Sequence, residues 1–145
     1  MKILVINGPN INLTGLREQS VYGAKTYDDL IALCEQEAEK LGVSVSFFQS
    51  NHEGALVDAI QQAYFDKVEG IVINPAAYTH TSVALLDAVK SVSIPTVEIH
   101  ISKVEEREDF RQVSFIRQAC IGTVTGLGTD GYLRAIDRLE AHYAG

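Results

Sequence analysis

The sequence predicts an α/β fold, a three-layer sandwich in which a five-stranded parallel sheet lies between two layers of helices. Short runs rich in Val and Ile alternate with helical patterns, and the runs are almost continuously apolar, as expected of strands buried on both faces. The runs span residues 2–6, 43–48, 70–74, 96–101 and 121–127. Because strand and helix alternate, each connection is a crossover, and right-handed crossovers produce a parallel sheet that is covered on both sides.

Helical patterns fill most of the intervals between these runs. The clearest begins after Thr26, because Asp29 completes a capping-box signature three residues later and Gly42 supplies a stop. The interval 102–120 is charged and less regular, so we expect a long loop and a short helix there. Three further apolar faces recur at helical spacing: Leu56, Ala59, Ile60 and Ala63; Val83, Leu85, Leu86 and Val89; Tyr132, Ile136, Leu139 and Tyr143.

Composition and charge limit the classes of function. A chain of 145 residues that is 46% hydrophobic suits one domain, spanning residues 1–145. Its net charge of −7, with no basic cluster, argues against a nucleic-acid partner. The first residues, MKILVINGPN, resemble neither a signal peptide nor a membrane span, so we expect a cytoplasmic protein with no membrane partner. Cys34 and Cys120 form no CxxC pair and are interpreted as reduced, buried thiols.

Two motifs suggest a cofactor or a metal, and neither has the necessary context. GLGTDG, residues 126–131, matches the dinucleotide-binding pattern GxGxxG, but the chain has no further strand with an acidic residue about 20 positions later. We interpret it as a tight turn between a strand and a helix. His52, His80 and His100 lack ligands at metal-site spacing, and His52 follows a strand predicted at the sheet edge. We therefore expect no metal.

The predicted topology selects the candidate site before any chemistry is considered. In the commonest order for five such strands, 2-1-3-4-5, the chain reverses direction between the first and third strands, and ligands bind at that point. The loops after residues 2–6, 70–74 and 96–101 lie next to it. Polar side chains gather in these loops: Asn10, Arg17, Tyr22, Asn74, His80, His100 and Ser102.

Tyr22 is a candidate base. A phenol with a reference pKa near 10 is a poor base at neutral pH unless a cation favours its anion, and Arg17 lies five residues earlier. A neighbouring charge moves a pKa by about 1–3 units, so one arginine is barely sufficient. In the alternative interpretation, Arg17 pairs with Glu18, and both of them and Tyr22 are ordinary polar loop residues.

His100 is a candidate acid. An imidazole can hold a proton for a leaving group near neutral pH. Glu98 precedes His100 by two residues, so both point to the same side of a strand and the carboxylate could orient the imidazole. A base and an acid in neighbouring loops suggest removal of one proton and delivery of another, as in an elimination or an isomerisation.

Several long motifs in one order resemble those of the type II 3-dehydroquinate dehydratases. They are NGPNINLTGLRE followed by VYG, then SNHEG, INPAAYTHTS, and EIHIS followed by REDFR. The resemblance implies a flavodoxin-like fold, no cofactor or metal, and a homo-dodecamer built as a tetramer of trimers. It also implies a hydro-lyase reaction, the anti elimination of water from 3-dehydroquinate to 3-dehydroshikimate through an enolate, in aromatic biosynthesis or quinate breakdown.

The resemblance also assigns roles by position. Tyr22 matches the base, Arg17 the group that favours its anion, and Asn10 the residue that helps to hold a water against the enolate oxygen. His100 matches the general acid, with Glu98 beside it. The stretch from Gly15 to Gly23 would be a lid with a glycine hinge at each end. The implied substrate contacts are Asn74, His80, Asp87, Ile101, Ser102 and Arg111.

Some positions depart from the family pattern, although none of them is catalytic. Ala76 stands where Gly is common, and the other departures are Gln19, Leu86, Lys103 and Gln112.

Two rival interpretations stay open. One is an inactive flavodoxin-like module that binds a small molecule, and the other is an imine mechanism for the same reaction, which needs a buried lysine such as Lys25 or Lys103.

Overall fold

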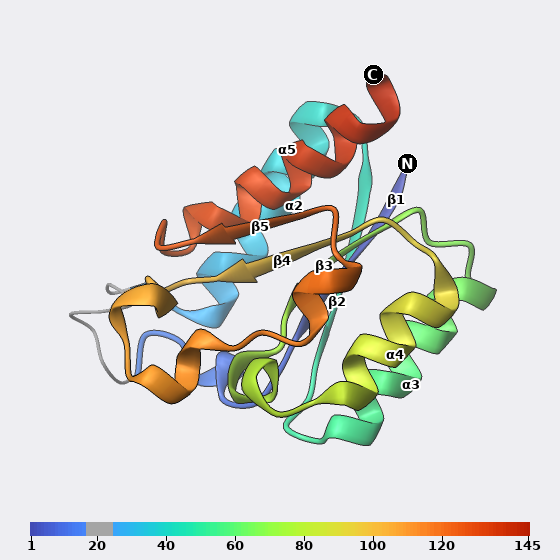
Figure 1. The fold of residues 1–145 in the computed structure, drawn as a ribbon. Coiled ribbons are helices and arrows are strands. Elements are labelled where there is room, and N and C mark those ends of the chain that lie inside the picture. The colour runs from blue at the N-terminus through green and yellow to red at the C-terminus, as the bar shows by residue number, and fades with distance from the viewer. Residues whose placement is uncertain (17–24) are drawn as a thin grey trace.

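A computed structural model of the chain describes residues 1–16 and 25–145. Five parallel strands form one sheet in the order β2-β1-β3-β4-β5 (Figure 1), which confirms the predicted sheet and its order. Their observed ends lie within two residues of the predicted ends, and those of β3 coincide with them. The strands are β1 (Lys2–Asn7), β2 (Ser44–Gln49), β3 (Gly70–Asn74), β4 (Thr96–His100) and β5 (Gly122–Thr125).

Four α-helices within the described residues complete the three layers. They are α2 (Tyr27–Leu41), α3 (Glu53–Phe65), α4 (Val83–Val92) and α5 (Asp130–Ala144). Helices α2 and α5 cover one face of the sheet, while α3 and α4 cover the other (Figure 1). No helix within residues 1–16 and 25–145 has the length and apolar character needed to cross a membrane.

The strands separate two hydrophobic cores by the alternation of their side chains. On β1, Ile3 and Val5 pack toward α2 and α5, whereas Ile6 packs toward α3 and α4. On β4, Val97 and Ile99 belong to the first core. The alternate residues of β4, which include Glu98 and His100, therefore face the side of α3 and α4.

Helix α2 begins and ends as its sequence predicts. The Thr26 side chain accepts a hydrogen bond from the Asp29 backbone N–H (3.2 Å), and the Asp29 carboxylate accepts one from the Thr26 N–H (3.0 Å). These two bonds form a complete capping box. At the other end, Gly42 adopts φ 71°, a left-handed conformation that glycine reaches without steric cost.

The segment after β4 is more broken than the predicted loop with one short helix. It contains three short 3₁₀ turns, η3 (Val104–Glu106), η4 (Asp109–Gln112) and η5 (Ile116–Ala119). Ile116 is fully buried in the core under α3 and α4, which fixes η5 on the sheet. The Gln112 side-chain amide donates to the Val104 carbonyl (2.8 Å) and so joins η4 to η3. These tertiary contacts have no periodic signal in the sequence.

The GLGTDG stretch forms the turn between β5 and α5 and the first two residues of α5, in agreement with the structural interpretation of its glycines. Gly126 and Gly128 have φ angles of 77° and 62°. Their N–H groups donate to the carbonyls of Ser102 (3.1 Å) and Ile101 (3.0 Å), respectively. A Cβ at Gly131 would lie 2.5 Å from Ile99 Cδ1, so this glycine permits α5 to pack closely on the sheet. The turn thereby holds the loop that follows β4.

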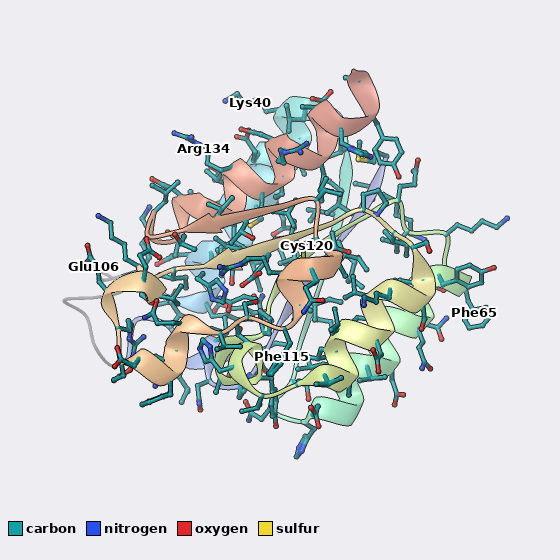
Figure 2. All side chains as sticks on the ribbon, viewed as in Figure 1. Lys40, Phe65, Glu106, Phe115, Cys120 and Arg134 are labelled. Carbon is teal, nitrogen blue, oxygen red and sulfur yellow. The ribbon has the colours of Figure 1, made fainter. Side chains whose placement is uncertain are left out.

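The two cysteines are free, and their environments differ from each other. Cys34 is fully buried, as predicted, whereas Cys120, which follows η5 (Figure 2), is only partly buried. Burial raises the pKa of each thiol to about 12. Both groups are therefore protonated and unreactive at neutral pH.

Candidate active site

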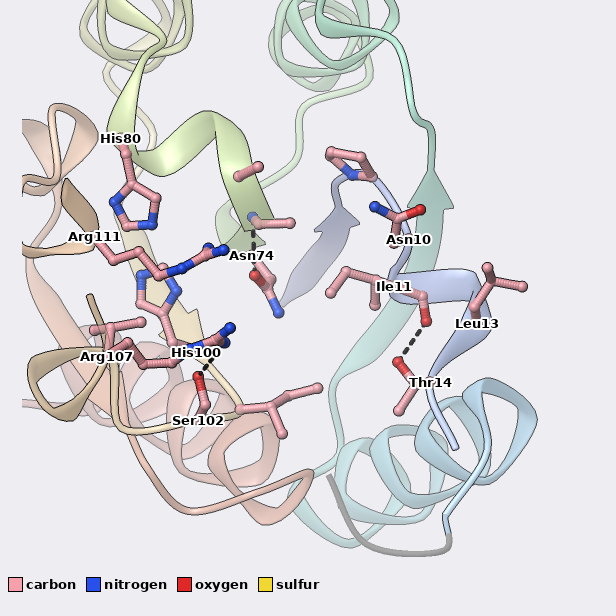
Figure 3. A pocket seen from close by; sticks show the side chains of 15 residues that line it. Asn10, Ile11, Leu13, Thr14, Asn74, His80, His100, Ser102, Arg107 and Arg111 are labelled. Atoms are coloured by element: carbon pink, nitrogen blue, oxygen red, sulfur yellow. Dashed lines mark hydrogen bonds between the residues drawn. The ribbon is translucent and has the colours of Figure 1, made fainter. Parts of the chain in front are cut away.

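A pocket of about 310 Å³ lies at the carboxyl ends of β1, β3 and β4. Its walls come from the loops after these three strands (Figure 3). This is the point between β1 and β3 where the chain reverses direction, and it is the location that the topology predicts. Most of the predicted site residues line it: Asn10, Asn74, His80, His100, Ile101, Ser102 and Arg111.

The other predicted residues are not part of this lining. Tyr22 and Arg17 lie outside the described residues, as does Gln19. Glu98 is fully buried beneath His100 and contacts the pocket only through it. Asp87 is exposed on α4 and does not line the pocket of its own chain.

The loop after β1 is positioned by the loop after β2. Asn10 adopts φ 70°, a left-handed conformation that asparagine tolerates better than most residues. Its N–H donates to the Asn51 side-chain oxygen (3.0 Å), and the Gln49 amide donates to the same oxygen (3.3 Å). Asn51 belongs to the SNHEG motif, so this motif acts on the site by holding Asn10 rather than by lining the pocket.

A buried hydrogen-bond chain fixes Asn74. The Tyr132 hydroxyl is fully buried, accepts from the Asn74 side-chain amide (2.9 Å) and donates to the Asn7 side-chain oxygen (2.6 Å). The Asn74 side-chain oxygen accepts from the Ala76 N–H (3.1 Å). Ala76 has φ 53°, a left-handed backbone conformation that favours glycine.

His80 and His100 each have one ring nitrogen fixed by the protein. His80 Nδ1 lies 2.7 Å from the Val113 carbonyl oxygen, and since a carbonyl only accepts, Nδ1 carries a proton. His100 Nε2 lies 2.5 Å from a Glu98 carboxylate oxygen and donates to it. Nδ1 of His100 is left as the ring atom that can exchange a proton with a bound molecule.

Glu98 is a buried carboxylate that stays ionised. Burial by itself raises its pKa, but hydrogen bonds from His100 and Arg117, together with their charges, outweigh burial and lower the pKa to about 2. At neutral pH this carboxylate is therefore an acceptor only, and it fixes the N–H of His100 on Nε2. The predicted pairing of Glu98 with His100 on one side of the strand is present.

Two arginines give the pocket a positive lining, and the sequence analysis missed one of them. Arg107 Nη1 donates weakly to the Ser102 hydroxyl (3.4 Å), and Arg111 Nε donates to the Glu108 carboxylate (2.5 Å). Both belong to the REDFR motif, where the four-residue spacing of the arginines was the available signal. The described lining residues include two arginines and two histidines but no Asp or Glu. A protein of net charge −7 thus has a pocket suited to an anion.

The described residues contain no cluster of three or more His, Cys, Asp or Glu side chains that could hold a metal ion. His52 is the first residue before α3, away from the two pocket histidines. The lining instead combines hydrogen-bond donors, cations and an oriented imidazole. The fold and site together define a parallel α/β protein with a pocket whose lining suits an anion and includes an oriented imidazole.

Comparison with known proteins identifies the family. Residues 1–140 match the model of the family described as dehydroquinase class II. The chain therefore belongs to the class II dehydroquinase family. It is 51% identical over 139 residues to the 3-dehydroquinate dehydratase of Caldicellulosiruptor bescii, covering 96% of each chain. It is 54% identical over 138 residues to that of Lachnospira eligens, covering 94% of each.

A solved structure agrees with this assignment. The type II dehydroquinase of Butyrivibrio crossotus superposes with a TM-score of 0.94 at 51% sequence identity, over 96% of this chain and 97% of the other. The flavodoxin-like arrangement implied by the sequence motifs is thus the arrangement of the family.

Tyr132→Phe should destabilise the protein by roughly 1–3 kcal/mol, because Asn7 and Asn74 would each lose a buried hydrogen-bond partner. Urea denaturation measures this change. Tyr143→Phe is the matched control, since its hydroxyl also bonds a carbonyl (Glu69, 2.7 Å) but the side chain is 49% exposed, so water can replace the lost bond. Equal losses in the two variants would contradict the structural role of the Tyr132 hydroxyl.

Proposed function

We propose that this protein catalyses the anti elimination of water from 3-dehydroquinate to give 3-dehydroshikimate, as a cofactor-independent hydro-lyase. The observation that carries the proposal is the pocket in which His100, held by Glu98, faces two arginines. Such a pocket suits a carboxylate substrate that loses a hydroxyl group. The relatives that share about half of the chain's residues are named 3-dehydroquinate dehydratases, and this supports the same reaction here.

In the proposed mechanism Tyr22 begins the reaction. Its phenolate removes a proton from the carbon next to the ketone, and the Arg17 guanidinium favours the phenolate. The resulting enolate oxygen is stabilised by a water held at Asn10, where fixed donors lower the barrier. The backbone N–H of Asn10 is held by Asn51, so the Asn10 side chain extends from a fixed backbone position.

His100 completes the elimination as general acid. Its Nε2–H is engaged by Glu98, so the proton for the departing hydroxyl leaves from Nδ1. The Glu98 carboxylate stabilises the protonated imidazole and keeps its ring in one orientation. Glu98 is thus assigned a catalytic role that it exerts on His100, and it does not contact the substrate itself.

The remaining pocket residues are assigned to substrate binding. Backbone N–H groups at Ile101 and Ser102 can hold the substrate carboxylate as an anion nest does. His80, Asn74 and Arg111 can meet its hydroxyl groups. Arg107 adds positive charge beside Ser102 and is assigned here to the same anionic group.

The reaction belongs to the shikimate pathway, which supplies chorismate and the aromatic amino acids, and the same chemistry serves quinate catabolism. A cytoplasmic location is part of the proposal.

The direct test is a continuous ultraviolet assay for the conjugated enone product with 3-dehydroquinate as substrate. We expect turnover by the wild type and a loss of at least about 10²-fold in kcat for Tyr22→Phe and for Arg17→Ala, as removal of general base catalysis usually causes. Tyr64→Phe is the matched control, because Tyr64 is 58% exposed on α3. Folded protein without turnover would instead favour the inactive binding module, and near wild-type turnover in either variant would remove that residue from the mechanism.

Borohydride treatment in the presence of substrate separates the enolate route from the imine route. An imine mechanism needs a buried lysine of low pKa. Lys25 and Lys103 have side chains that are 50% and 57% exposed and lie 3.8 Å from Asp130 and Glu106, respectively. We therefore expect mass spectrometry to detect no reduced covalent adduct. A trapped adduct would replace the enolate route with the imine route.

Asp87 binds substrate in this proposal only from a neighbouring copy, because it does not line the pocket of its own chain. The proposed assembly is the homo-dodecamer, a tetramer of trimers. Asp87→Asn should raise KM, and mixed oligomers of Asp87→Asn with Tyr22→Phe should be more active than either variant, since some pockets combine both native residues. Asp58→Asn, an exposed aspartate on α3, is the control. A fully active monomer, measured by light scattering, would contradict the shared site.

A further inference from the structure

We propose that Arg117 is a positioning residue for the general acid, acting through Glu98 on His100. This inference rests on the proposed function and adds a residue outside the pocket to it. Arg117 does not line the pocket, and no motif of the sequence analysis includes it. Its guanidinium nevertheless contacts the carboxylate that orients His100.

The contact between Arg117 and Glu98 is a two-bond fork. Arg117 Nε donates to Glu98 Oε1 (3.1 Å), and Arg117 Nη2 donates to Oε2 (3.1 Å). Oε2 also accepts from His100 Nε2 (2.5 Å) and from the Ser114 hydroxyl (2.9 Å). A carboxylate held on both oxygens cannot rotate without breaking bonds, so the acceptor for His100 has one position.

Burial explains why this carboxylate needs a cation. Glu98 has no exposed side-chain surface, whereas the Arg117 side chain is 45% exposed. An ionised carboxylate without a partner in such a place is strongly disfavoured. Arg117 reaches it from the solvent side, so the protein desolvates the carboxylate fully and the guanidinium only in part.

The backbone around Arg117 is fixed by packing. Ile116 is fully buried, the Arg117 carbonyl accepts from the Cys120 N–H (3.2 Å), and Cys120 Sγ donates to the Ile116 carbonyl (3.3 Å). The turn η5 therefore presents the guanidinium to β4 from a rigid position. This anchoring distinguishes Arg117 from an arginine on a free surface loop.

The charged and titratable groups that face Glu98 are few. His100 comes from its own strand, Arg117 from η5, and the Cys120 thiol from the end of η5. Glu105 is near Arg117 and favours its charge. Burial raises the pKa of the Cys120 thiol to about 12, so at neutral pH this group is uncharged. His100 and Arg117 are therefore the partners that keep Glu98 ionised.

Arg117→Ala tests the role in two independent ways. We expect kcat to fall about tenfold with KM within about twofold, the lower end of the loss that follows removal of a partner that orients a metal-bound histidine. We also expect the pKa of Glu98, followed by ¹³C NMR of its carboxyl carbon, to rise above the value of about 2, because burial remains while two hydrogen bonds and a cation are lost. The lowered pKa stabilises the fold above pH 4.5 and less so toward pH 2, so the variant loses stability mainly at neutral pH.

Further variants show whether Arg117 acts through Glu98. In a Glu98→Gln background, Arg117→Ala should cost no further activity, because the carboxylate charge that Arg117 stabilises is already absent. Arg117→Lys should restore part of kcat, since it keeps the charge but not the fork. Arg138→Ala, which removes an exposed arginine that donates to a carbonyl (Ile121, 3.3 Å), is the matched control and should leave kcat unchanged.

Losses from Arg117→Ala and Glu98→Gln that simply add, or an unchanged Glu98 titration in Arg117→Ala, would overturn the proposal. The NMR titration does not depend on turnover. An inactive wild type would therefore reject the proposed function through the ultraviolet assay, while the titration still decides whether Arg117 holds the Glu98 charge.

Discussion

The pocket depends on one constraint, the pairing of β1 with β3 at the centre of the sheet. The chain leaves β1 toward α2 on one face and leaves β3 toward α4 on the other, so the two loops diverge and a crevice opens between them. Gly8 N–H donates to the Asn74 carbonyl (2.8 Å) just where they part. A Cβ at Gly8 would lie 2.5 Å from the Pro75 carbonyl oxygen, so this close approach requires glycine.

Buried polar groups give the crevice its chemistry. Tyr132 links Asn7 with Asn74 under the pocket floor, and Glu98 supports His100 from within the sheet. Burial of such groups is unfavourable unless each finds hydrogen-bond partners, and these have them. Because Tyr132, Glu98 and Arg117 lie outside the pocket lining, the orientation of the pocket side chains depends on hydrogen bonds made behind that lining.

Charge is distributed differently over the whole chain and over the pocket lining. The chain as a whole is acidic, but described residues that line the pocket carry arginine and histidine instead. Two acidic side chains contact this lining from outside it, Glu98 through His100 and Glu108 through Arg111, and Glu98 is also paired with Arg117. The pocket therefore keeps a positive potential toward an incoming anion while its acid is held by a negative group.

The sequence by itself determined the sheet, its order, the capping of α2 and the loops that carry the site, because these follow from local periodicity and from the rule that parallel strands end at one edge. Long motifs also determined the family. The three turns after β4, the role of Asn51 beneath Asn10 and the contact of Arg117 with Glu98 were decided only by the tertiary structure. Each of these joins residues far apart in the chain, through burial and hydrogen bonds that leave no periodic pattern in the sequence.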